Sequence, residues 1–223
     1  MRTILLALVT IAGLALPHTL SAQGLALAGR AGTLGLGAEA AVGLGERLAL
    51  RGGVGLLPFE PSVTIEDIDF TLSLPDTWFN IGADLYLGGG FRLGGGMLFK
   101  SDDPSIDGRP TESVEIGGRD YTPEEIGNIV GTFDSGSSAP YVLLGFGRHV
   151  LSGIGLFADF GVAFMGEQEV GLEAPNANFD TQIEEEEFRA RLEEEERDFE
   201  EDAGSYLDYW PILNIGVKIG LGR

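Results

Sequence analysis

The feature that most constrains this chain is a strict alternation of apolar residues with small or polar residues, which recurs in seven segments. Near the C-terminus, for example, Leu, Ile and Val occupy every odd position from 213 to 221, whereas Asn214 and Lys218 lie at even positions. Successive side chains of a β-strand point to opposite faces of a sheet, so a period of two residues predicts strands. The seven segments are residues 34–44, 47–56, 78–87, 91–100, 142–147, 154–164 and 213–221.

The two faces of these segments differ sharply in composition. One face is almost entirely Leu, Ile, Val, Phe and Ala, whereas the other face is mostly Gly with isolated charges. A soluble sandwich or barrel usually places polar residues on its outer face, so this asymmetry favours a membrane barrel with its apolar face toward lipid. Most segments are close to the roughly 9–11 residues that a tilted strand needs to cross a bilayer. A soluble periplasmic barrel of the lipocalin type is the alternative.

The connections between the segments alternate in length. Residues 43–46, 88–90 and 149–153 form short connections, and residues 58–70, 101–139 and 171–205 form long ones. Outer-membrane barrels alternate short periplasmic turns with long extracellular loops in this way, and their strand number is even. We therefore predict an all-β fold, a single antiparallel up-and-down transmembrane β-barrel of about eight strands. The eighth strand is assigned to residues 24–31, with residues 129–133 as the alternative.

The N-terminus has the pattern of a secretory signal peptide. Arg2 gives a positive start, residues 4–16 are uncharged and mostly apolar, and Ala22 offers a small residue for cleavage. The apolar run is shorter than the roughly 20 residues that a membrane-spanning helix needs. We predict a signal peptide over residues 1–22 and an outer-membrane barrel over residues 23–223. Cleavage after Ser21 and an uncleaved anchor are the alternatives.

The remaining composition excludes several functions. The formal net charge of −21 argues against nucleic-acid binding, which requires clustered Lys and Arg. Without cysteine, the chain has no thiolate metal site, thiol nucleophile or lipoprotein anchor. His149 falls in a predicted turn with no apolar pocket nearby, and Asp102, Asp103 and Asp107 match no calcium-loop spacing. We predict no catalytic residue, no metal site and no cofactor, and hence no enzyme activity.

Isolated charges lie on the side of the strands that would face the barrel lumen. An eight-stranded barrel is only wide enough for its own side chains, so these groups are expected to pair with one another and fill the lumen. The alternative is a proton or ion pathway through a narrow channel or transporter for small solutes. The well-embedded residues of this lumenal charge network are Glu39, Arg51, Asp84, Arg92, Asp159 and Lys218.

An acidic helix is predicted at residues 180–204, in the long loop before the last strand. Thirteen acidic residues between positions 180 and 202 face only three arginines. Phe188, Leu192 and Phe199 fall on one narrow apolar stripe at 100° per residue. This stripe would dock on the barrel rim or fold over the barrel mouth. The favoured interpretation is a solvated loop helix, and the alternatives are a lid or an acidic surface for a cationic partner.

Six stretches, which together span nearly the whole mature chain, carry a resemblance to a known family: residues 31–39, 91–96, 139–141, 145–147, 159–162 and 210–211. Through them the sequence resembles proteobacterial outer-membrane β-barrel proteins of unassigned function. The resemblance implies a small barrel and supplies no activity. Such proteins usually end in an aromatic residue that the barrel assembly machinery reads, whereas this chain ends in Leu221-Gly222-Arg223, which implies either inefficient assembly or an atypical insertion signal.

Together these observations predict an exported outer-membrane barrel with a structural or surface-interaction role. Its expected partners are outer-membrane lipid and the barrel assembly machinery, and the protein is expected to be a monomer.

Overall fold

A computed structural model describes residues 24–58, 60–65, 68–147, 153–166 and 169–221. The predicted signal peptide, both histidines (His18 and His149) and the C-terminal Arg223 lie outside the described residues.

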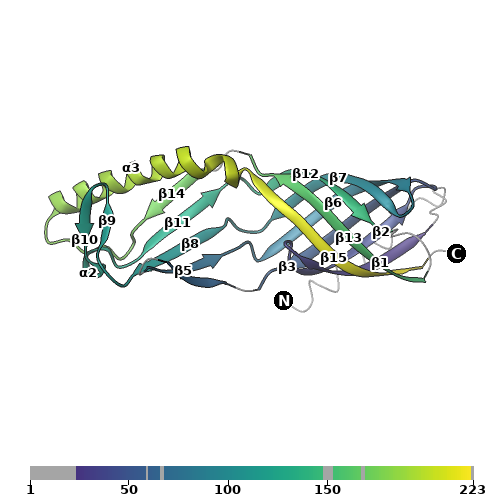
Figure 1. Cartoon of the computed structure of the whole chain (residues 1–223), viewed down its shortest axis with the longest axis horizontal. Helices are drawn as coiled ribbons and strands as arrows, with labels where there is room; N and C mark the ends of the chain where they lie inside the picture. Colours follow the sequence, from purple (N-terminus) through teal and green to yellow (C-terminus); the bar gives the residue numbers. More distant parts are fainter. Residues whose placement is uncertain (1–23, 59, 66–67, 148–152, 167–168, 222–223) are drawn as a thin grey trace.

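Eight long strands close into an antiparallel barrel in the order β1-β15-β13-β12-β7-β6-β3-β2 (Figure 1). The barrel is up-and-down, because each strand pairs with the barrel strand that precedes or follows it along the chain and β15 pairs with β1 to close it. The strands are β1 (Leu25–Gly32), β2 (Leu36–Gly43), β3 (Leu48–Leu56), β6 (Thr77–Gly88), β7 (Phe91–Lys100), β12 (Ser138–Phe146), β13 (Gly153–Phe164) and β15 (Tyr209–Gly220). The predicted fold class is confirmed, and β1 supplies the eighth strand.

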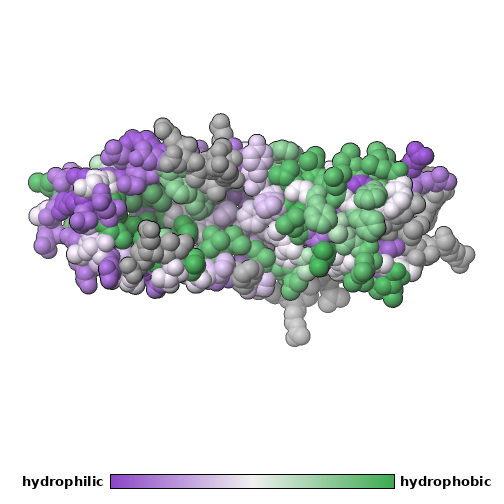
Figure 2. Space-filling view, viewed as in Figure 1, coloured by the Kyte–Doolittle hydropathy of each residue, from purple (hydrophilic) through white to green (hydrophobic). Residues whose placement is uncertain are grey.

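The alternation of the sequence becomes an outer and an inner face of the barrel. Leu36 and Ile215 are each 66% exposed, Ile81 is 62% exposed and Phe160 is 57% exposed. The neighbouring inward positions carry Gly, Ala and the buried charges. In Figure 2, hydrophobic residues cover much of the barrel half of the molecule. The outward apolar positions therefore have the orientation that the sequence predicts, except Leu34, which the phase of its segment places outside and which is buried in the lumen.

Two of the three long connections, and the beginning of the third, do not form the loops expected from the sequence. They contain β4 (Ser62–Ile65), β5 (Ile68–Ser73), β8 (Ser105–Pro110), β11 (Ile129–Asp134) and β14 (Glu169–Glu173), which form a five-stranded sheet in the order β14-β11-β8-β5-β4. This order repeats that of the barrel strands to which they connect, so the sheet extends the barrel at one end (Figure 1). The segment considered as an alternative eighth barrel strand is β11 of this sheet. We call the sheet and the elements packed on it the extension.

Two helices and a short hairpin complete the extension. The hairpin pairs β9 (Val114–Ile116) with β10 (Arg119–Tyr121), and α2 (Pro123–Ile126) follows it. The acidic helix before the last strand, α3 (Gln182–Leu207), runs along the extension in Figure 1. A capping box begins α3, because Thr181 and Glu184 exchange hydrogen bonds between side chain and backbone. No helix among the described residues is long and apolar enough to cross a membrane.

The apolar side of α3 packs on the extension and not on the barrel rim or mouth. Phe188 and Leu192 are buried in a cluster with Ile116, Tyr121 and Ile126. Tyr121 contacts Phe188 edge-on, with ring centroids 5.0 Å apart. Docking on the barrel was therefore the wrong expectation for this stripe, because the hairpin and α2 supply an apolar surface that the sequence pattern did not reveal.

Candidate functional site

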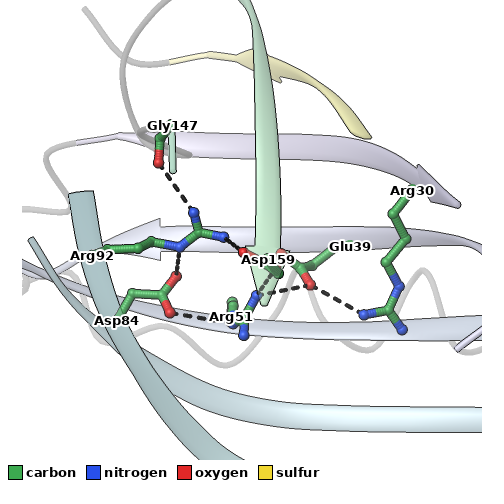
Figure 3. A network of polar contacts seen from close by, with 7 residues as sticks. All are labelled: Arg30, Glu39, Arg51, Asp84, Arg92, Gly147 and Asp159. Atoms are coloured by element: carbon green, nitrogen blue, oxygen red, sulfur yellow. Dashed lines mark hydrogen bonds and ion pairs between the residues drawn. The ribbon is translucent and has the colours of Figure 1, made fainter. Parts of the chain in front are cut away.

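The barrel lumen contains six buried charged side chains that form one continuous network (Figure 3). Each comes from a different strand and points inward, because it occupies the face opposite the large apolar residues. The side chains are Arg30 of β1, Glu39 of β2, Arg51 of β3, Asp84 of β6, Arg92 of β7 and Asp159 of β13. Three arginines therefore meet three carboxylates, and the formal charge of the network is zero.

Arg51 lies at the centre of this network and contacts all three carboxylates. Its Nη1 atom lies 2.9 Å from Asp159 Oδ2 and 3.6 Å from Glu39 Oε2. Its Nε atom lies 3.4 Å from Asp84 Oδ1. Arg30 extends the network at one end, with its Nη1 atom 3.5 Å from Glu39 Oε2. One planar guanidinium thus joins strands that are far apart in the sequence, which is the geometry for which Arg is suited.

Arg92 completes the network at the other end. Its Nε atom donates to Asp84 Oδ2 at 3.0 Å, and its Nη2 atom donates to Asp159 Oδ1. Its Nη1 atom donates to the carbonyl oxygen of Gly147 at 3.1 Å, where the chain leaves β12. The guanidinium therefore ties the network to the end of the barrel that carries the short turns.

The structure brings five of the six predicted lumenal residues together and adds one that the sequence reading missed. Lys218 is buried on β15, where its side chain packs along Gly155 of β13, but the third base of the drawn network is Arg30. The signal for Arg30 was present, because it shares the phase of Ala26 and Ala28 and lies opposite Leu25 and Leu27. It was overlooked because the strand that carries it was the least regular of the eight.

An apolar cluster fills the lumen on the side of the extension. Trp78 is fully buried there and packs against Trp210, with ring centroids 4.9 Å apart. The side chain of Tyr141 lies against Gly82 of β6, where an added Cβ atom would lie 2.3 Å from the tyrosine hydroxyl oxygen. Glycine is thus required at position 82 for this close approach. The buried members are Leu34, Trp78, Leu98, Ala139, Tyr141, Leu143, Ala163, Met165 and Ile212.

A small cavity separates the charged network from the apolar cluster. Its volume is about 10 Å³, which is roughly the space that one water molecule needs. Its lining includes the polar side chains of Arg30, Arg51 and Asn80 and the apolar side chains of Leu98 and Ile212. Paired charges therefore occupy one level of the lumen, and aromatic and aliphatic side chains occupy the next.

The acidic helix uses some of its carboxylates to cover a sheet edge. Glu196 accepts a hydrogen bond from the backbone N–H of Leu172, and Glu200 accepts one from Val170, each at 3.0 Å. Both donors belong to β14, the outermost strand of the five-stranded sheet. An open strand edge would otherwise present unpaired N–H groups to other chains. The carboxylates of α3 therefore take the place of a neighbouring strand.

The third residue of the predicted apolar stripe has different surroundings. Phe199 is 42% exposed, whereas Phe188 and Leu192 are buried. Its ring lies 6.1 Å from that of Phe133 on β11, measured between centroids. The stripe therefore covers the hairpin and α2 with its first two members and reaches the sheet with its third.

The loop acids considered as cation ligands have separate partners. Asp102 accepts from the Ser101 hydroxyl, Asp103 from Lys100, and Asp107 from Asn128 at 2.6 Å. Among the residues that the structure describes, no group of three or more His, Asp or Glu side chains is arranged to hold a metal ion.

Comparison with known proteins gives structural neighbours only. No protein-family model matches the sequence, and no curated protein is detectably similar to it. The crystal structure of Acinetobacter baumannii CarO2 aligns with a TM-score of 0.61 and 17% sequence identity, over 90% of this chain and 99% of that one. Acinetobacter baumannii CarO aligns with a TM-score of 0.57 and 16% identity, over 91% of this chain and 99% of that one. At these identities the likeness shows the fold alone, which is the eight-stranded barrel.

Proposed function

We propose that this chain is a closed outer-membrane barrel of a Gram-negative bacterium that holds its extension at the cell surface for interaction with other molecules. It would be exported by the signal peptide of residues 1–22 and inserted by the barrel assembly machinery. In this role the barrel anchors the protein in the membrane, and the extension makes the contacts with other molecules.

The apolar belt supports membrane insertion. All eight strands expose large apolar side chains, with Leu27 at 53%, Leu144 at 62% and Leu156 at 75% as examples. Monomeric soluble proteins rarely expose a contiguous apolar patch larger than a few hundred Å². The belt argues against a soluble lipocalin-like barrel, whose outer face would be polar. The belt also favours a monomer, because it runs over all eight strands and none of them differs from the others as a contact surface for a second copy would.

The single observation that carries the closed-barrel role is the two-level closure of the lumen. A solute crossing the barrel would have to separate Arg51 and Arg92 from Asp84 and Asp159, and then displace Trp78. Leaving one partner of a buried ion pair uncompensated costs about 3–5 kcal/mol. The cavity between the two levels has a volume of about 10 Å³, roughly the space of one water molecule, which is too small for a solute.

Reconstituted protein is therefore expected to carry no steady current. Purified protein inserted into planar bilayers should leave the conductance at the level of the bare membrane, and insertion should be verified by heat-modifiable gel migration of the same preparation. A general porin in the same bilayers serves as the positive control. Reproducible single-channel steps that scale with the amount of inserted protein would overturn the closed-barrel role.

A further inference from the structure

The five-stranded sheet of the extension has one apolar face and one polar face. Phe70 of β5, Ile106 of β8, Phe133 of β11 and Leu172 of β14 line a common groove on the apolar face. The alternate positions on these strands carry polar residues such as Asp107. A sheet with this pattern needs a cover for its apolar face, and α3 supplies only part of it.

Among the described residues, the part of the apolar face that α3 does not cover forms a groove of about 460 Å³, which reaches Phe199 of α3. Each described residue that lines it is an aliphatic or aromatic residue, a proline or a glycine. In Figure 2, apolar side chains are visible between the hydrophilic surfaces of the extension half. The volume falls within the roughly 300–1,000 Å³ that is typical of small-molecule sites. With no polar group among its lining residues, the groove suits a hydrocarbon chain.

Acidic side chains of α3 lie beside the apolar lining of the groove. Val170 and Leu172 line the groove, and their backbone N–H groups bind Glu200 and Glu196. The whole of α3 carries twelve acidic residues against three arginines. An amphiphile with an anionic head would be repelled by these side chains, whereas a cationic head would be attracted.

We propose that the groove binds the hydrocarbon chain of a cationic amphiphile, whose ammonium group lies beside Glu196 and Glu200. This inference deepens the surface-interaction role proposed above and rests on it for the location of the site. The apolar groove accounts for binding of the chain, and the carboxylates account for selection of the head.

The test uses the full chain in nanodiscs of zwitterionic lipid, with empty nanodiscs as the background. Two fluorescent probes share one dansyl-labelled eleven-carbon chain and differ only in the terminal group, which is an amine in one and a carboxylate in the other. We expect saturable binding of the cationic probe with a blue-shifted dansyl emission, and at least about tenfold weaker binding of the anionic probe, since about 1.4 kcal/mol of head-group preference corresponds to tenfold.

Two glycines on neighbouring strands provide matched variants. A Cβ atom at Gly131 would point at Ile106 and Leu172 in the groove, whereas one at Gly171 would point at Thr132. Gly131 pairs with Leu172, and Gly171 pairs with Thr132 in the same ladder. Gly131→Leu should lower the affinity for the cationic probe at least about tenfold, because it fills the groove. Gly171→Leu should leave the affinity unchanged.

The charge beside the groove can be removed with little change in shape. Glu196→Gln combined with Glu200→Gln keeps two acceptors for the β14 backbone and removes two negative charges. This double variant should lose most of the preference for the cationic probe while still binding the chain. Because the double variant leaves Gly131 unchanged, it tests the proposal even if Gly131→Leu disturbs the sheet.

Equal affinity for the two probes, or unchanged binding by Gly131→Leu, would overturn the inference. Gel migration and bilayer conductance of the same preparations separate this failure from failure of the proposed function. A protein that is heat-modifiable and non-conducting but binds neither probe would refute only the proposed binding site in the groove. A conducting protein would refute the closed-barrel role.

Discussion

Replacing Arg51 with methionine should destabilise the barrel by about 3–5 kcal/mol, because it leaves one negative charge uncompensated inside the lumen. Arg51 contacts three carboxylates, at 2.9 Å from Asp159, 3.4 Å from Asp84 and 3.6 Å from Glu39. Arg30 and Arg92 would remain to pair with three acids. Methionine replaces the aliphatic part of the arginine side chain with an apolar chain of similar reach, so most of the packing of that part is kept.

The measurement is the urea midpoint for unfolding of the protein in lipid vesicles. Arg47→Met is the matched control, since Arg47 is exposed on the turn between β2 and β3. We expect its effect to stay within about 0.5 kcal/mol. Arg51→Lys should fall between the two, because an ammonium keeps the charge but lacks the planar fork that reaches several carboxylates. An Arg51→Met protein as stable as the wild type would mean that the network does not hold the barrel together.

Replacing Ile81 with arginine should destabilise the inserted barrel by about 2–4 kcal/mol, the cost of a cation on the lipid face near the bilayer midplane. Ile81 is 62% exposed near the middle of β6. The same substitution at Ile154, beside the short-turn end of β13 and 80% exposed, should cost only about 0–1 kcal/mol, because the penalty falls toward the interface.

Ile183 of α3 offers a control outside the barrel, at 69% exposure. Ile183→Arg should leave the urea midpoint in vesicles unchanged, since this position faces water. The destabilisation by the three Ile→Arg variants should therefore rank with depth in the bilayer, and the variant at Ile81 should be the least stable. Equal effects at all three positions would show that exposure to lipid does not distinguish them.

The barrel was the part that sequence reasoning could predict, because its strands are long and their alternation repeats. Each of the seven predicted segments contributes a barrel strand, and their apolar phase is correct at Leu36, Ile81, Phe160 and Ile215. A shift of one residue would place every apolar side chain in the lumen, so the phase is strongly specified. The inward position of Arg51 and Asp84 follows from the same phase.

Of the strands of the extension, the sequence indicated only β11, and only as an alternative barrel strand, because these strands are three to six residues long. Two or three alternating residues do not distinguish a strand from a loop. The sheet forms by pairings between distant parts of the chain, such as β11 with β14, and by the cover that α3 provides. The helix itself was predictable from its composition, but the surface on which Phe188 and Leu192 pack depends on those distant elements.

The orientation of the strands relative to lipid is the claim on which the rest depends, and site-directed fluorescence quenching tests it directly. The chain contains no cysteine, so single cysteines at positions 36, 81, 160 and 215 can each carry one bimane label in vesicles. Lipids with doxyl groups on their acyl chains should quench all four labels strongly, whereas a label at Ile183 of α3, which is 69% exposed, should respond to aqueous iodide. Quenching of the four barrel labels by iodide, with no response to the doxyl lipids, would contradict a membrane barrel with an apolar exterior.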